Sequence, residues 1–280
     1  MGTYLGQNFL MNKFKLRKIA DVLELEKGDT VIEIGPGHGE LTLLLAKNFQ
    51  FSIFNFQIIA IEKDEQLAKD LKNRIHDLGL GKNIEIIEGD ALKILPALNT
   101  KYKIQNTKYK LVGNIPYYIT GYLLRILGEL ELKPNLIILT IQKEVAQRIA
   151  AKPPKMNLLA ASVQFWAKPK IIGYISRKDF RPAPKVDSAI IKFNIKTSDV
   201  SRTSDVQKLK YYKLIKVLFK QPRKTILNNL KSSAKGGSAS GGQISNLKND
   251  EFLKKIAKAG VNPFDRPQNL TIEQIKNLSI

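Results

Sequence analysis

The chain has 280 residues, of which 43% are hydrophobic and 25% charged, and these globular proportions exclude wholesale disorder. Its 46 Lys and Arg against 25 Asp and Glu leave a net charge of +21, which indicates a polyanionic partner, either nucleic acid or an anionic membrane surface, unless the whole proteome is rich in Lys. The absence of Cys excludes disulfides, Cys-bound zinc and thiol catalysis, and the two distant histidines, His38 and His76, argue against a metal site.

The N-terminal two thirds alternate short apolar strands with amphipathic helices. In chain order, we predict a helix at 15–25, a strand at 31–34, a helix at 40–47, a strand at 58–61, a helix at 66–78, strands at 84–87, 109–112 and 136–142, and a helix at 144–151. This alternation predicts a doubly wound, mainly parallel, Rossmann-like α/β sheet. Ligands of such sheets lie beyond the carboxyl ends of the strands, so the residues that follow each strand are the first candidates for a site.

The pattern changes after Phe193. A polar linker is expected at 196–206, a helix at 207–230 that Pro222 should break, a mobile Gly/Ser-rich loop at 231–242, and short helices at 252–259 and 271–278. We therefore expect a doubly wound domain at residues 1–196 and a small all-helical domain at 197–280. The N-terminus has no apolar signal core and no apolar run is long enough to span a bilayer, so we expect a soluble, cytoplasmic protein.

A glycine-rich turn follows the first strand. Gly35, Gly37 and Gly39 allow the backbone to approach a ligand closely. Glu62 ends the second strand and can bind a ribose diol, while Asp90 ends the third and can accept a hydrogen bond from an adenine amino group. This order is typical of an S-adenosylmethionine pocket. A tight structural turn with two solvated acids, or a nicotinamide dehydrogenase, are the alternative interpretations.

The fourth strand runs into the sequence GNIPYYIT. The side-chain oxygen of Asn114 and the backbone carbonyl of Ile115 can accept hydrogen bonds from an adenine amino group and localise its lone pair toward a methyl donor. Pro116 restrains the loop, and Tyr117 can stack on the base. No strong general base is needed, because the nitrogen becomes acidic once it is alkylated. The alternative is a strand-to-loop turn with a structural Pro and a core Tyr.

At this point the sequence resembles a known family, the small-subunit (16S) ribosomal RNA adenine dimethyltransferases of the kasugamycin-sensitivity type. The resemblance covers nearly the whole chain and rests on motifs that occur in order: GQNFL at 6–10, EIGPGHGELT at 33–42, IEKD at 61–64, GD at 89–90, GNIPY at 113–117, QKEVAQRI at 142–149, FRPAPKVDSAI at 180–190 and QPRKTILNNL at 221–230.

The resemblance implies an activity and a set of site residues. Members use S-adenosylmethionine to dimethylate the amino groups of two adjacent adenines in a hairpin loop near the 3′ end of 16S rRNA, within the small ribosomal subunit during its assembly. It implies cofactor contacts at Asn8, Leu10, Gly35, Gly37, Glu62, Asp90 and Asn114, and catalytic roles for Asn114, Ile115, Pro116, Tyr117 and Phe180. Unaided, the sequence would place Phe180 in the core; the resemblance makes it the second aromatic residue that faces the target base.

The resemblance also implies RNA contacts at Arg181, Lys185, Arg223 and Lys224. We expect a monomeric protein with no metal and no membrane partner. Three other functions remain open. A 23S rRNA adenine methyltransferase of the macrolide-resistance type shares the glycine turn and the NIPY loop. A non-catalytic RNA-binding assembly factor would have no use for the glycine turn, Asp90 and the NIPY loop together, and a DNA amino-methyltransferase would need a larger recognition domain.

The positive charge is concentrated in two segments. Residues 140–185 and 196–231 each contain ten Lys or Arg and two Asp or Glu, so together they account for 16 of the 21 net charges. They flank the expected base-binding loop, and the second segment covers the start of the helical domain. This distribution favours an RNA backbone beside the pocket over a proteome-wide bias or a membrane surface.

Overall fold

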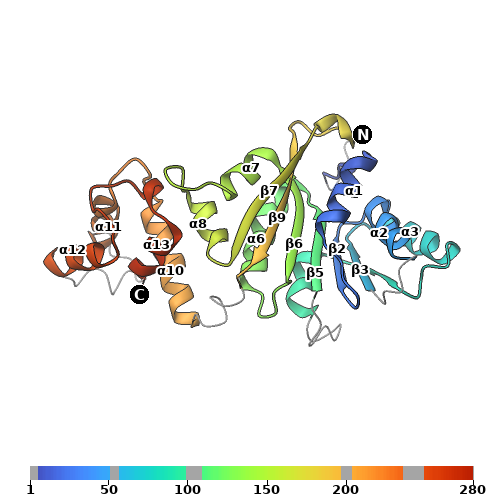
Figure 1. Ribbon diagram of the computed structural model, residues 1–280, viewed down its shortest axis with the longest axis horizontal. Helices are drawn as coiled ribbons and strands as arrows, with labels where there is room; N and C mark the ends of the chain where they lie inside the picture. The colour runs from blue at the N-terminus through green and yellow to red at the C-terminus, as the bar shows by residue number, and fades with distance from the viewer. Residues whose placement is uncertain (1–5, 51–56, 99–108, 197–203, 236–248, 280) are drawn as a thin grey trace. The chain divides into compact units, whose positions relative to one another are not determined.

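The computed structural model describes residues 6–50, 57–98, 109–196, 204–235 and 249–279 (Figure 1). The chain forms two compact units, the first of Met1–Gln147 and Lys168–Ile195, the second of Arg148–Ala167 and Lys196–Ile280. The chain therefore enters the second unit twice, at Arg148 and again at Lys196. The expected domain boundary at 196/197 lies at the second of these two points. Residues 148–167, which the sequence analysis assigned to the first domain, group with the C-terminal helices instead.

The first unit is organised around a seven-stranded sheet in the order β4-β3-β2-β5-β6-β9-β7. The strands β4, β3, β2, β5 and β6 pair in parallel, and β9 pairs with β6 in antiparallel orientation. The doubly wound, mainly parallel, Rossmann-like fold is therefore confirmed. The bounds are β2 (Thr30–Ile34), β3 (Gln57–Glu62), β4 (Ile84–Glu88), β5 (Tyr109–Asn114), β6 (Leu136–Gln142), β7 (Ala167–Ile175) and β9 (Ser188–Ile195).

The order of the strands creates a switch point between β2 and β5. From β2 the chain moves outward through β3 to β4, and it then returns to place β5 on the other side of β2. In the ladder, Ile34 pairs with both Ile61 and Gly113, so the carboxyl ends of β2, β3 and β5 lie at one level. Such a switch point is where doubly wound sheets bind ligands.

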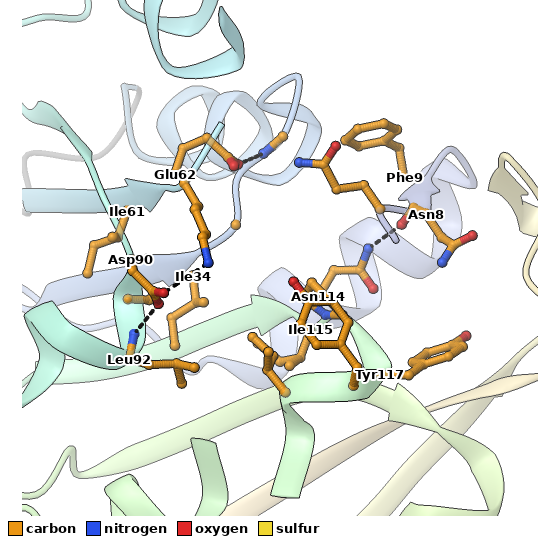
Figure 2. A pocket seen from close by; sticks show the side chains of 18 of the residues that line it. Asn8, Phe9, Ile34, Ile61, Glu62, Asp90, Leu92, Asn114, Ile115 and Tyr117 are labelled. Carbon is orange, nitrogen blue, oxygen red and sulfur yellow. Dashed lines mark hydrogen bonds and ion pairs between the residues drawn. The ribbon is translucent and has the colours of Figure 1, made fainter. Parts of the chain in front are cut away.

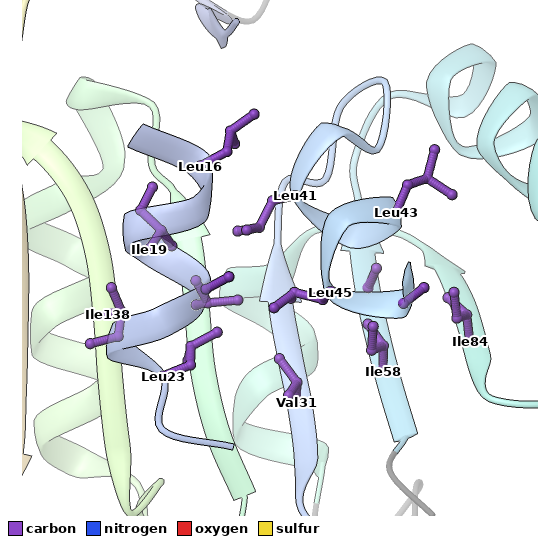
Figure 3. Packing of buried hydrophobic residues seen from close by; sticks show 14 of the residues in the cluster. Leu16, Ile19, Leu23, Val31, Leu41, Leu43, Leu45, Ile58, Ile84 and Ile138 are labelled. Carbon is purple, nitrogen blue, oxygen red and sulfur yellow. The ribbon is translucent and has the colours of Figure 1, made fainter. Parts of the chain in front are cut away.

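Helices cover the sheet, and their apolar faces form the core. In the first unit these are α1 (Lys13–Val22), α2 (Glu40–Gln50), α3 (Glu65–Asp77), α4 (Ala91–Ile94), α6 (Thr120–Glu129) and α7 (Lys143–Ile149), which extends into the second unit, with 3₁₀ turns η1 (Leu95–Ala97), η2 (Tyr117–Ile119) and η3 (Arg177–Asp179). Figure 3 shows α1 and α2 packed over the sheet, with Leu23, which directly follows α1, and Leu45 of α2 on the side of the helices that faces the strand of Val31.

The second unit is helical. It comprises α8 (Leu158–Gln164), α10 (Asp205–Leu218), α11 (Ile226–Lys235), α12 (Asn249–Lys258), η4 (Pro267–Asn269) and α13 (Ile272–Ser279). Phe165, just after α8, stacks on Tyr211 of α10 with ring centroids 4.3 Å apart, and the Tyr211 hydroxyl donates to the Ala161 carbonyl over 2.9 Å. These contacts explain why residues 148–167 belong to this unit.

The C-terminal part of the chain confirms one detail of the sequence-based prediction and corrects another. The break at Pro222 is confirmed, because α10 ends at Leu218 and α11 begins at Ile226. The loop predicted at 231–242 was wrong at its start, because 231–235 continue α11; residues 236–242 lie outside the described residues. The sequence analysis also gave no prediction for β7, β9 or the two-stranded sheet of β1 (Phe9–Leu10) and β8 (Phe180–Arg181).

Candidate functional site

A pocket of about 820 Å³, including space open to solvent, lies at the carboxyl ends of the parallel strands (Figure 2). The residues that line it come from the N-terminal segment, the ends of β2 to β5 and β8: Gln7, Asn8, Phe9, Ile34, Gly35, Gly37, Ile61, Glu62, Lys63, Gly89, Asp90, Ala91, Leu92, Asn114, Ile115, Pro116, Tyr117, Tyr118, Ile119 and Phe180.

The glycine turn borders the pocket in a conformation that favours glycine. Gly35 and Gly37 have φ values of +65° and +59°. A Cβ atom at Gly35 would meet no described heavy atom within 4 Å, so the backbone there faces open pocket space, whereas one at Gly37 would stand 2.7 Å from the Phe9 ring. The turn therefore leaves room for a ligand at Gly35 and lets Phe9 close over Gly37.

Glu62 is held by two backbone amides. The Gly37 N–H donates to Oε2 over 3.0 Å and the Asp64 N–H donates to Oε1 over 2.9 Å. The side chain is only 3% exposed, yet it lines the pocket. Because each carboxylate oxygen can accept more than one hydrogen bond, Glu62 can still bind a pair of hydroxyl groups from the pocket side.

Asp90 follows β4 and caps the short helix α4. Its Oδ1 accepts from the Leu92 N–H over 3.0 Å, and its Oδ2 lies 3.0 Å from the Lys63 ammonium. Partial burial alone would raise the pKa of Asp90, but the Lys63 ammonium and the Leu92 amide outweigh it and lower that pKa. Asp90 is therefore an ionised acceptor at the wall of the pocket.

The loop after β5 presents Asn114 to the pocket with a defined orientation. Its Nδ2 donates to the Asn8 carbonyl over 2.7 Å, so its Oδ1 is left as the acceptor. The Ile115 N–H donates to the Thr140 carbonyl over 3.0 Å, and the Ile119 N–H donates to the Pro116 carbonyl over 3.1 Å. Asn114 is thus fixed by the N-terminal segment, and the peptide N–H of Ile115 is fixed by β6.

Two aromatic side chains flank this loop. The Tyr117 hydroxyl is 2.8 Å from the hydroxyl of the fully buried Ser188, and partial burial raises the pKa of Tyr117, which keeps the phenol neutral. Phe180 is 1% exposed and lines the pocket from β8. Sequence reasoning alone placed Phe180 in the core; it is buried and also faces the pocket.

Glu33 lies one residue before the end of β2 and is 2% exposed. The Thr42 hydroxyl donates to its Oε2 over 2.7 Å. Burial is the main reason why the pKa of Glu33 is raised to about 7, and the nearby Glu40 and Glu62 raise it further, against the opposing effect of Thr42. The charge of this side chain therefore changes near neutral pH.

The structure does not bring all the sequence-predicted residues to the pocket. Leu10 is 4% exposed and packs in the hydrophobic core rather than against the pocket. Arg181 and Lys185 are exposed and lie outside the pocket lining. Arg223 and Lys224 are exposed between α10 and α11 in the second unit.

The sequence analysis missed several lining residues, among them Gln7, Phe9, Lys63 and Tyr118. Lys63 follows Glu62 directly, and its position at a strand end was a usable signal. Among the described residues, no group of three or more His, Asp or Glu could hold a metal ion. No helix in the described part of the chain is long and apolar enough to cross a membrane.

Comparisons with known proteins agree on one family. A family model described as "Ribosomal RNA adenine dimethylase" matches residues 2–264. A protein of Dehalococcoides mccartyi named "Ribosomal RNA small subunit methyltransferase A" is 37% identical over 276 residues, covering 99% of this chain and 86% of that protein. A Moorella thermoacetica protein of the same name is 32% identical over 281 residues, covering 98% of this chain and 90% of that protein.

Solved structures agree on the fold. A dimethyladenosine transferase from Plasmodium falciparum superimposes with a TM-score of 0.75 and 25% identity, covering 96% of this chain and 95% of that one. The 23S rRNA methyltransferase ErmE superimposes with a TM-score of 0.70 and 22% identity, covering 97% and 98%. At that identity, the second comparison shows the fold alone.

Proposed function

Because the chain belongs to the ribosomal RNA adenine dimethylase family, we propose that it transfers methyl groups from S-adenosylmethionine to the amino groups of two adjacent adenines of 16S rRNA. The proposed target is a hairpin loop near the 3′ end, modified during assembly of the small subunit. The observation that carries this proposal is the Asn114 amide, whose Nδ2 is held by the Asn8 carbonyl so that Oδ1 is the acceptor at the pocket.

The residues at the glycine turn fit the cofactor. Open space at Gly35 suits the amino-acid end, the anchored carboxylate of Glu62 suits the ribose hydroxyls, and the ionised Asp90 suits the adenine amino group. Asn8 and Gly37 complete this side of the pocket. When bound, S-adenosylmethionine supplies an electrophilic methyl group, and the chain supplies position and electrostatics.

On the opposite side, the loop after β5 receives the target adenine. Oδ1 of Asn114 and the carbonyl of Ile115 accept the two amino hydrogens, which draws the nitrogen lone pair out of the ring. Tyr117, held by Ser188, stacks on the base, and Phe180 forms the other wall. Pro116 directly precedes η2 as its N-cap residue and fixes the turn. After the first transfer one hydrogen remains, so the second transfer requires the nitrogen to rotate within the same pair of acceptors.

The substrate is 16S rRNA in the small ribosomal subunit, and we expect the protein to act in the cytoplasm as a monomer, without a membrane partner. Arg181, Lys185, Arg223 and Lys224 are exposed cations that suit contacts with RNA phosphates. The second unit is the proposed RNA-docking domain, because residues 196–231 contain ten Lys or Arg against two acids.

One experiment separates the candidate activities. The protein is incubated with methyl-labelled S-adenosylmethionine and undermethylated 30S subunits, 50S subunits or bare DNA, and the label is mapped. We expect dimethyladenine in 16S rRNA. Label in 23S rRNA would support the macrolide-resistance type, label in DNA a DNA amino-methyltransferase, and no label with tight 30S binding an assembly factor; each would refute the proposal.

The Asn114→Ala variant tests the mechanism within the same assay. We expect it to lose most turnover while cofactor affinity falls much less, because Oδ1 contacts the target rather than the adenosine. Asn114→Asp should also lose turnover, since its carboxylate cannot donate to the Asn8 carbonyl. Near-normal dimethylation by the alanine variant would rule out this role.

A further inference from the structure

The first two turns of α1 have an unusual charge pattern. Residues 11–18 read MNKFKLRK, with four cations and no acid. Helix N-termini carry a partial positive charge that disfavours cations. The first turn of α1 has no acidic residue, as is also true of α4, α6, α8 and α11, and it has the cations Lys13 and Lys15. The Asn12 side chain caps α1 by accepting from the amides of Phe14 and Lys15. The helix dipole does not favour this charge pattern, so the stability of the helix does not explain it.

An aromatic side chain projects from the same helix face. Phe14 is 85% exposed, the highest value among the large hydrophobic side chains of the described residues. Phe14, Arg17 and Lys18 are spaced i, i+3 and i+4, so they share one face, opposite the buried Leu16 and Ile19. An aromatic ring among cations on an exposed face is the pattern that binds unpaired nucleotides through stacking and phosphate contacts.

Hydrogen bonds fix the start of α1 beside η3, near the turn between β7 and β9 in Figure 1. The Met11 N–H donates to the Asp179 carbonyl over 2.8 Å, and the Asn12 amide donates to Asp179 Oδ1 over 2.8 Å. In the next turn, the Lys15 ammonium donates to the Tyr174 carbonyl over 2.8 Å. The exposed Arg177 and Lys178 of η3 therefore lie next to α1.

The acid content of this region is low. Residues 168–185 contain six cations, and their one acid, Asp179, already accepts from Asn12. On α1, Asp21 lies in the last turn, beyond the cations. We define the N-terminal basic surface as Lys13, Phe14, Arg17, Lys18, Arg177 and Lys178. It carries five cations, and a polyanion placed on it meets little repulsion.

The surface is continuous with the wall of the pocket. β1 pairs with β8 through Phe9↔Arg181 and Leu10↔Phe180, and Phe9 and Phe180 both line the pocket. α1 begins three residues after β1 ends, and η3 ends directly before β8. A strand that leaves the pocket on this side would therefore pass over the N-terminal basic surface.

We propose that the N-terminal basic surface binds the RNA that flanks the target adenine, with Phe14 stacked on an unpaired base and the cations on phosphates. This inference rests on the proposed function, since it takes RNA as the substrate. The surface is continuous with the pocket wall, which favours RNA over an anionic membrane, because membrane binding does not require a surface next to the pocket.

The test compares two charge-matched double variants. Arg17→Gln/Lys18→Gln removes two cations from the surface, and Lys69→Gln/Lys72→Gln removes two exposed cations from α3. Binding to undermethylated 30S subunits is measured at several salt concentrations. Two lost phosphate contacts should reduce the salt slope by about 1.4–1.8 and lower affinity roughly 25- to 60-fold at 0.1 M salt. The α3 variant should bind like the wild type.

Phe14→Ala provides the second arm. We expect roughly 5- to 150-fold weaker binding, the range for losing one stacked base, with an unchanged salt slope because no charge is lost. The dissociation constant for S-adenosylhomocysteine and the melting temperature should stay at wild-type values in all three variants, which excludes misfolding as the cause.

The outcomes distinguish this inference from the proposed function. If the wild type methylates 30S subunits while the α1 variants bind them as tightly as the α3 control does, the surface is not an RNA site. Equal losses in both double variants would mean that only net charge matters. Binding to anionic phosphatidylglycerol vesicles, lost in the α1 variants while 30S affinity is kept, would assign the surface to a membrane. Failure of the wild type to methylate any RNA would overturn the proposed function itself.

Discussion

Replacing the buried acid beside the glycine turn should stabilise the protein at alkaline pH. Glu33 is 2% exposed, its Oε2 accepts from the Thr42 hydroxyl, and burial raises its pKa from 4.5 to about 7. Glu33→Gln keeps an oxygen that can accept from Thr42 and removes the charge. The variant therefore isolates the cost of ionising a carboxyl group inside the sheet.

The sign and size follow from proton linkage. Because the folded-state pKa is above the unfolded value, the stabilising contribution of Glu33 is fully present below pH 4.5 and is lost as the pH rises through 7. A difference of about 2.5 pKa units corresponds to roughly 3 kcal/mol at pH 8, but to less than about 1 kcal/mol at pH 5. Glu33→Gln should therefore exceed the wild type in stability by about 3 kcal/mol at pH 8 and by little at pH 5.

Hydrogen exchange of the β2 and β3 amides is the suitable assay. The single tryptophan, Trp166, lies in the second unit, so its fluorescence would report on the wrong part of the chain. The control is Glu85→Gln, which removes a carboxylate from an exposed position on β4. A wild-type-to-variant difference that is the same at pH 5 and pH 8, or a Glu33→Gln protein that is less stable at pH 8, would refute the reasoning.

Three further predictions concern the pocket. Glu62→Ala should raise the dissociation constant for S-adenosylhomocysteine, measured by calorimetry, and unchanged affinity would exclude the ribose role. Tyr117→Phe leaves the Ser188 hydroxyl buried without its 2.8 Å partner, so it should lower stability by about 1–3 kcal/mol in chemical unfolding while the retained ring keeps most RNA affinity; an unchanged midpoint would contradict this. Gly113→Ala would place a Cβ 2.8 Å from the Ile34 carbonyl and so strain the contact between β5 and β2, and turnover should fall more than cofactor affinity. Normal turnover would show that β5 and β2 accommodate the added methyl group.

The sequence predicts the pocket well where position along a parallel strand decides it. Glu62, Asp90 and Asn114 each follow a buried apolar run, and the carboxyl ends of neighbouring parallel strands meet at one edge. The sequence alone therefore suffices to predict the fold and to place these three residues at the pocket. The same rule could have identified Lys63, which directly follows Glu62 at the end of its strand.

Other features depend on long-range contacts that leave little trace in the sequence. β1 and β8 are two residues long, so they show no periodicity, and only their mutual pairing defines them. Leu10 alternates with Phe9 along β1, which turns Phe9 to the pocket and Leu10 to the core. Residues 148–167 follow the sheet without a linker, and their place in the second unit is set by contacts such as Phe165 with Tyr211, about 46 positions apart in sequence.

The N-terminal segment connects the two sides of the proposed reaction. In the proposed mechanism, the Asn8 carbonyl determines which end of the Asn114 amide faces the target. Asn8 directly precedes β1, which pairs with the strand that carries Phe180. If the Asn8 carbonyl moved away, the Asn114 amide could rotate and present Nδ2 to the adenine amino group, a donor against a donor. The segment must therefore lie in place before an adenine can be held for transfer. Any variant that loosens β1 from β8 should reduce turnover through Asn114 even though every residue of the NIPY loop is intact.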